Sequence, residues 1–115
     1  MPPFSHEVKL EIHEEQGGKC LGCDKPIEST HHSLPEVYGG LSIRDNGVGV
    51  CRECHEVMDK WSLDYGITVL GRLNELPDEF FRDGNPFKGI STEELNTMNR
   101  EQLIPIAKRH KKHRR

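Results

Sequence analysis

The amino-acid sequence predicts a small α+β domain that is stabilised by zinc and has flanking helices. Only 33% of the 115 residues are hydrophobic, so the apolar core of a single domain of this size should be thin. Four cysteines fall into two Cys-x-x-Cys pairs, and a bound metal can supply the stability that such a core lacks. Helix and strand patterns alternate along the first half of the chain, which favours a mixed α+β architecture.

The first predicted element is a helix over residues 5–16. Ser5 can cap its N-terminus, and Ile12 belongs to its partial apolar face. The pair Gly17-Gly18 should end the helix, because glycine readily adopts the left-handed conformation that follows many helices.

A hairpin and a second helix are predicted next. Strand patterns cover residues 29–34 and 48–50, and a long loop with glycines and polar residues separates them. The second strand leads directly into a predicted helix over residues 51–63. Trp61 and Leu63 are expected to pack that helix against the core.

The second half of the chain should be mainly helical. Residues 67–70 are compatible with a strand or a helical turn, and residues 77–82 with a short helix. Two capping boxes predict helices over residues 91–98 and 100–110. We therefore divide the chain into a cysteine-containing core, a helical extension of the same domain and a basic tail, at residues 1–63, 64–107 and 108–115.

The tail holds six of the 16 Lys and Arg residues, whereas the chain has 19 Asp and Glu. It is either a solvated, disordered end or an arm that binds nucleic acid by releasing counterions from phosphates. The basic residues concerned are Lys108, Arg109, Lys111, Lys112, Arg114 and Arg115.

The sequence also excludes some classes of protein. No stretch approaches the roughly 20 apolar residues of a membrane span, and a core this thin does not suit a large metabolic enzyme. The first residues lack the basic and apolar segments of a secretory signal, so a cytoplasmic location is expected.

The cysteines predict a structural zinc site. Cys20 and Cys23 are separated from Cys51 and Cys54 by 27 residues, and a two-residue spacer lets both sulfurs of a pair reach one ion. The second pair opens a helix, as in treble-clef-like zinc sites. Disulfides would require an oxidising compartment, and a redox or iron–sulfur role is a further alternative. Bound Zn²⁺ would also contribute folding energy.

Between and after these pairs, the histidines complete a pattern in the order Cys-x-x-Cys, His31-His32-x-x-Pro, Gly-Gly, Asn46, Cys-x-x-Cys-His55. This pattern closely resembles that of the HNH endonucleases, over about residues 5–60. The other histidines lack such a context and are expected to face solvent.

The resemblance implies a ββα-metal fold, two strands and a helix around one divalent ion, that hydrolyses DNA phosphodiester bonds. It implies that His32 is the general base, that His31 and His55 bind the catalytic ion, and that Asn46 holds the loop between the strands. The ion would be Mg²⁺, Mn²⁺, Ni²⁺ or Zn²⁺.

The predicted strand and helix also determine which of these side chains can share a face. Adjacent residues of a strand point to opposite faces, so His31 and His32 should serve different purposes. His55 and Asp59 are four residues apart on a helix and share a face, so Asp59 is expected to join the two metal-binding histidines.

The expected partner is DNA, cut with weak sequence specificity. Small proteins of this family occur in bacteriophages, which makes phage packaging proteins such as the terminase candidate partners. The alternative is a non-catalytic zinc module that binds nucleic acid or protein.

Overall fold

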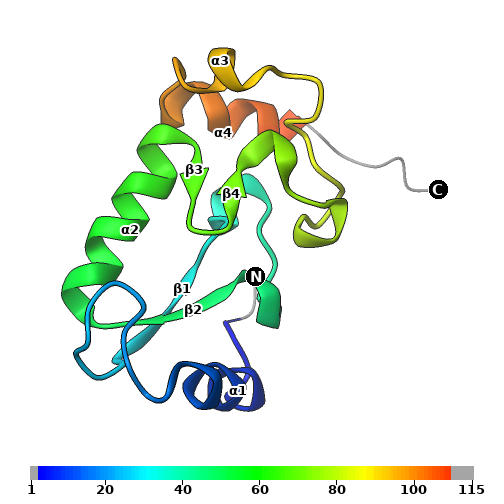
Figure 1. Ribbon diagram of the computed structural model, residues 1–115. Helices are drawn as coiled ribbons and strands as arrows, with labels where there is room; N and C mark the ends of the chain where they lie inside the picture. Colours follow the sequence, from blue (N-terminus) through cyan, green and yellow to red (C-terminus); the bar gives the residue numbers. More distant parts are fainter. Residues whose placement is uncertain (1–2, 110–115) are drawn as a thin grey trace.

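Two antiparallel hairpins and four α-helices make up the fold of residues 3–109, the part of the chain that the computed structural model describes (Figure 1). The helices are α1 (His6–Gln16), α2 (Arg52–Tyr65), α3 (Thr92–Leu95) and α4 (Arg100–Arg109). The strands are β1 (Ser29–His32), β2 (Gly47–Val50), β3 (Ile67–Thr68) and β4 (Gly71–Arg72). The small α+β architecture predicted from the sequence is therefore confirmed.

Helix α1 begins and ends where its sequence predicts. The hydroxyl of Ser5 accepts a hydrogen bond from the backbone N–H of Val8, and Gly17 follows the helix in the left-handed conformation with φ of 63°. Ile12 is fully buried. Gln16 joins α1 to β2, because its side chain both donates to and accepts from the backbone of Gly49.

The β1–β2 hairpin pairs His31 with Val48 and His32 with Gly47. The first strand ends two residues earlier than predicted. Beyond His32 the chain leaves the ladder, because the backbone N–H groups of the next two residues donate to the main chain and side chain of Asn46 at 3.0 and 2.7 Å.

Helix α2 lies alongside β1 and continues to Tyr65, two residues beyond its predicted end (Figure 1). The prediction for Trp61 was wrong, since this side chain is 48% exposed, whereas Leu63 packs against the core. Trp61 shares a face with Val57 and Tyr65, at four-residue spacing, and all three side chains are exposed.

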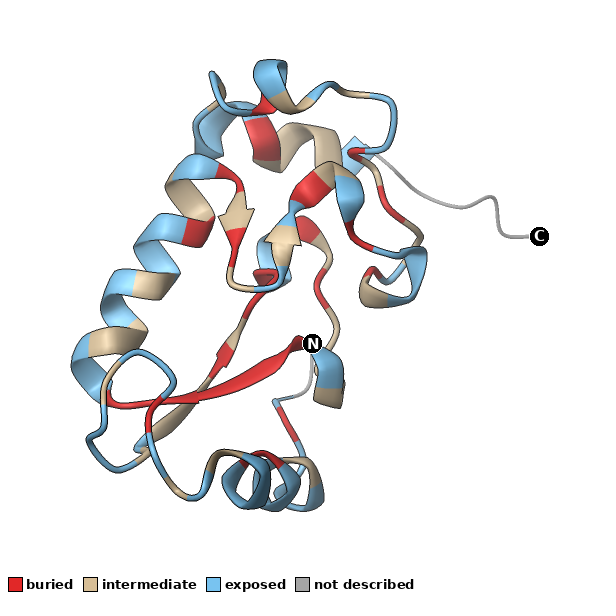
Figure 2. Ribbon diagram, viewed as in Figure 1, coloured by how far each residue is buried: buried red, intermediate tan, exposed pale blue. Residues whose placement is uncertain are grey.

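Most of the apolar core lies in the second half of the chain, where Figure 2 shows buried residues on several short segments. Its buried members are Leu34, Tyr38, Leu73, Leu76, Phe81, Phe87, Leu95 and Leu103. Around the β1–β2 hairpin, by contrast, the second buried cluster consists of two valines and two cysteines. The part of the domain with the thinner core is therefore the part that holds the cysteines.

The elements of the second half are short. Of residues 67–70, the first two form strand β3 and the last two form the turn to β4. Residues 78–80 form a single 3₁₀ turn. Ser91 caps α3 through the backbone N–H of Glu94, and Asn99 and Gln102 cap α4 reciprocally. Within residues 3–109, no helix combines the length and apolar character that crossing a membrane would require.

Candidate metal centres and catalytic site

The four cysteines converge into one cluster, although their two pairs are far apart in sequence. All four Sγ atoms lie within 4.8 Å of one another, and none of the thiols forms a disulfide. The Sγ atoms of Cys23 and Cys51 are 3.6 Å apart, and those of Cys23 and Cys54 are 3.8 Å apart. Sulfurs bound tetrahedrally to zinc at about 2.3 Å lie about 3.8 Å from each other, so this cluster fits a structural Zn²⁺.

The pKa values of these thiols also favour a bound metal cation. Burial opposes ionisation of Cys20, but backbone N–H groups of Cys51, Gly22 and Cys23 outweigh it and lower the pKa of this thiol to about 6. Interactions with the Cys51 and Cys20 sulfurs, together with burial, raise the pKa of Cys54 to about 12. Crowded thiolates thus repel one another, and a bound Zn²⁺ would allow all four to ionise.

The first Cys-x-x-Cys turn packs closely against α2 at Gly22. A β-carbon at this position would lie 3.0 Å from the Cys54 sulfur and 3.2 Å from the terminal methyl of Met58. The absence of a side chain therefore lets the first turn approach α2 closely.

A second group of potential ligands forms between β1 and α2. His31, His55 and Asp59 each offer a ligand atom, and these atoms lie within 4.8 Å of one another. The Asp59 carboxylate lies between the histidines, with one oxygen 2.8 Å from His31 Nδ1 and the other 3.5 Å from His55 Nε2. Ligands that surround one ion at about 2.1 Å are about 3.0–3.4 Å apart, so the group could hold a divalent ion.

The surroundings of the two histidines suit this use. The Oγ of Ser29 lies 2.6 Å from His55 Nδ1, and a hydrogen bond at that nitrogen leaves His55 Nε2 available as a ligand. His31 is fully buried, and burial lowers the pKa of its imidazole although the hydrogen bond and charge of Asp59 oppose this shift. A lowered pKa keeps the ring neutral at pH 7, as metal binding requires.

Three protein ligands leave coordination positions open. The Asp59 side chain is 52% exposed, and a hollow of about 330 Å³ opens at His55 and Asp59. Histidine and carboxylate ligands with open positions are typical of catalytic ions, whereas four thiolates form a closed structural site. The protein thus carries two different candidate metal centres on one small scaffold.

His32 lies on the other face of β1, as strand alternation predicts. Its ring contacts that of Phe4, with centroids 4.3 Å apart, and its Nε2 lies 2.9 Å from the Oγ of Ser42. Burial lowers the pKa of His32, while the negative charges of Glu36 and Asp59 partly counteract this effect. The imidazole is therefore neutral at pH 7 and able to accept a proton.

Asn46 is fully buried at the end of the loop between β1 and β2. Its side-chain oxygen accepts from the N–H of Leu34 at 2.7 Å, and its nitrogen donates to the carbonyls of Leu34 and Leu41 at 3.1 and 2.8 Å. The amide is thus used to hold the loop that carries Ser42, the hydrogen-bonding neighbour of His32.

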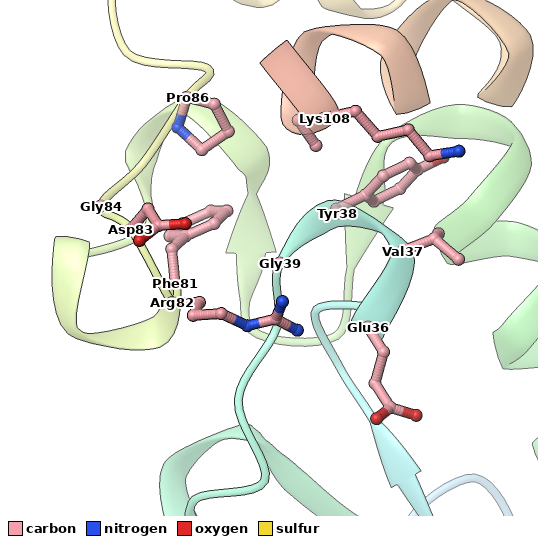
Figure 3. A pocket seen from close by; sticks show the side chains of 11 residues that line it. Glu36, Val37, Tyr38, Gly39, Phe81, Arg82, Asp83, Gly84, Pro86 and Lys108 are labelled. Carbon is pink, nitrogen blue, oxygen red and sulfur yellow. The ribbon is translucent and has the colours of Figure 1, made fainter. Parts of the chain in front are cut away.

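The basic residues of the tail lie elsewhere. Lys108 and Arg109 belong to the last turn of α4, and the remaining predicted contacts, Lys111, Lys112, Arg114 and Arg115, lie outside the described residues. Lys108 lines a hollow of about 410 Å³ together with Arg82 and Glu36 (Figure 3). This hollow contains neither group of potential metal ligands.

No model of a known protein family matches this chain, and it matches no curated protein and no solved structure. Sequence reasoning missed three polar side chains of the site, namely Gln16, Ser29 and Ser42. Each forms a hydrogen bond with a residue ten or more positions away in the sequence, and none belongs to a local pattern.

Proposed function

We propose that this protein is a metal-dependent endonuclease of the HNH type, which hydrolyses phosphodiester bonds of DNA. The observation that carries this proposal is the group of His31, His55 and Asp59 with His32 on the adjacent position of the same strand. A purely structural zinc module needs the four cysteines, but it has no use for a second set of ligands beside a neutral histidine.

In this proposal His32 is the general base. In the tautomer that donates its Nε2–H to the Oγ of Ser42, 2.9 Å away, Nδ1 is unprotonated and takes a proton from the attacking water. As the water oxygen bonds to phosphorus, the bond from phosphorus to the 3′ oxygen breaks. The products are a 5′-phosphate and a 3′-hydroxyl, whose proton comes from solvent water.

His31, His55 and Asp59 would hold the divalent ion. Such an ion would supply positive charge that stabilises the negative charge developing on the phosphate and on the departing 3′ oxygen. Ser29 orients the His55 ring, and burial keeps His31 neutral and in place. Asn46 fixes the loop that supports His32. A zinc ion held by the four cysteines would fix the start of α2, from which His55 and Asp59 project.

Plasmid cleavage tests the proposal. The zinc-loaded protein is incubated with supercoiled plasmid and with Mg²⁺, Mn²⁺, Ni²⁺ or Zn²⁺ in turn. At least one ion should support nicking or linearisation, and His32→Ala should slow cleavage about 10²–10⁴-fold, as is typical when a general base is lost.

Variants of the ligands should behave differently from His32→Ala. His31→Ala, His55→Ala and Asp59→Ala should need more metal for half-maximal cleavage, so that part of their loss is recovered at high metal concentration. His32→Ala should bind the ion normally in a calorimetric titration. If it loses the ion while His31→Ala retains it, the two roles are reversed. Full cleavage by both variants would show that these histidines do not form the catalytic site and would overturn the proposal. DNA binding by the parent without cleavage in any ion would favour the non-catalytic zinc module.

A further inference from the structure

A hollow of about 320 Å³ lies between α1 and β1, on the His32 side of the hairpin. It is lined by His32, Lys9 and His13, together with Phe4 and residues that lead into β1. Neither Lys9 nor His13 belongs to either group of potential metal ligands, and both side chains are exposed. Sequence reasoning placed His13 in solvent, and the structure adds that it borders this hollow.

Helix α1 separates its charges by face. Lys9 and His13 are four residues apart and lie on the same side of the helix, next to the face that buries Ile12. The helix also carries four acidic residues, none of which lines the hollow: Glu7, Glu11, Glu14 and Glu15. A helix rich in glutamate thus presents its lysine and a histidine towards His32, in a chain of net charge −3.

This hollow and the hollow beside His55 and Asp59 share two lining residues at the start of β1. Glu28 and Ser29 line both, with His32 in the first and His55 and Asp59 in the second. Within the described residues β1 pairs only with β2, so its other edge is not covered by a strand. A linear polyanion can therefore cross the start of β1 and contact both hollows.

We propose that Lys9 and His13 form a phosphate-binding subsite for the nucleic-acid strand that is cut, on the His32 side of the scissile bond. The inference rests on the proposed function, because it takes the substrate of that site to be a phosphodiester chain. With one phosphate at His31, His55 and Asp59, a neighbouring phosphate lies at Lys9 and His13. Arg52 offers a cation in the second hollow, which the carboxylates of Glu28, Glu56 and Asp59 also line.

The subsite supplies positioning as well as affinity. Phosphate contacts set the register of a protein on a nucleic acid but carry no information about its sequence. Lys9 would thus hold the backbone in place as His32 acts, and the protein would cut with weak sequence preference.

The test measures binding separately from cleavage. Fluorescence anisotropy of a labelled DNA duplex is recorded at several salt concentrations, with the zinc-loaded protein and no added divalent ion. Lys9→Ala should make the negative slope of log K against log salt shallower by about 0.9, as the loss of one phosphate contact predicts. The ratio of the parent's DNA-binding constant to that of Lys9→Ala should therefore fall about threefold between 50 and 200 mM salt.

Two matched variants control for charge. Lys9→Arg retains the charge and should retain the slope. Lys88→Ala removes an exposed lysine that pairs with Asp78 in the second half of the chain, and it should leave the slope unchanged. His13→Ala should also weaken binding of the duplex. Equal slopes for Lys9→Ala and Lys88→Ala would overturn the proposal.

Competition with inorganic phosphate distinguishes the nucleic-acid backbone from free phosphate as the ligand of this subsite. It should displace the DNA no better than chloride at equal ionic strength. Displacement beyond the chloride control that Lys9→Ala abolishes would make free phosphate the ligand and overturn the proposal. If the slope changes as expected but no ion supports cleavage, the subsite stands and the proposed endonuclease activity fails. If the parent cleaves and Lys9→Ala keeps the parental slope, only the subsite fails.

Discussion

Asn46→Ala tests whether one buried amide holds the candidate catalytic loop. The substitution removes three hydrogen bonds, to the N–H and carbonyl of Leu34 and to the carbonyl of Leu41. At about 1 kcal/mol for each bond, the free energy of unfolding should fall by about 3 kcal/mol, and by more if the buried Leu34 N–H finds no new acceptor.

The chain contains a natural control for this substitution. Asn85, 6% exposed, also makes three side-chain hydrogen bonds, donating to the carbonyls of Leu73 and Leu76 and accepting from the N–H of Phe87. Asn85→Ala should therefore cost a similar free energy of unfolding. It lies in the second half of the domain, away from His32, so it should not change cleavage by the folded protein.

The assay combines urea unfolding at fixed zinc concentration with plasmid cleavage at a temperature where all variants are folded. Asn46→Ala should cleave at least tenfold more slowly than the parent, because the loop that carries Ser42 no longer holds the His32 ring and small displacements of catalytic groups are costly. Asn85→Ala should stay within about twofold of the parental rate if the lost bonds are remote from the chemistry. Equal losses of cleavage in both variants, or a change in unfolding free energy below about 1 kcal/mol for Asn46→Ala, would refute the reasoning.

Four further outcomes follow from the same structure. Cys51→Ser should lose the bound zinc and cooperative unfolding together, as measured by metal analysis and circular dichroism; a variant that unfolds like the parent would contradict the zinc assignment. Gly40→Ala should destabilise the domain by about 3 kcal/mol or more in urea unfolding, because its β-carbon would lie 2.0 Å from the Leu34 carbonyl oxygen. Deleting residues 108–115 should flatten the salt dependence of DNA binding but leave the cleavage rate at saturating DNA intact; an unchanged salt slope would make the tail a solubility element. Without added divalent ion, an NMR titration should show the pKa of His31 below 6.5. Since the folded state then binds fewer protons than the unfolded state between the two pKa values, this contribution to stability is present above pH 6.5 and is lost as the pH falls through that window. A His31 pKa above 6.5 would contradict the dominance of burial.

Local patterns in the sequence determined the elements and much of the candidate site. Helix boundaries at Ser5 and Gly17 follow from capping, which depends only on neighbouring residues. The two-residue spacing within each cysteine pair and the four-residue spacing of His55 and Asp59 likewise place ligands on one side of a turn or helix. Alternation along β1 separated His31 from His32 for the same reason.

Only the tertiary structure decided which of these local units meet, and which side chains support them. One carboxylate oxygen of Asp59 reaches His31 across the gap between α2 and β1. Ser29 and Ser42 lie beside His55 and His32 because of packing between distant segments. Trp61 carries a core-like side chain but lies on the face of α2 that packing leaves exposed. These contacts depend on the relative placement of the elements, which burial and hydrogen bonding over the whole domain determine. Contacts between distant segments produce no periodic pattern in the sequence, so they could not be predicted from it.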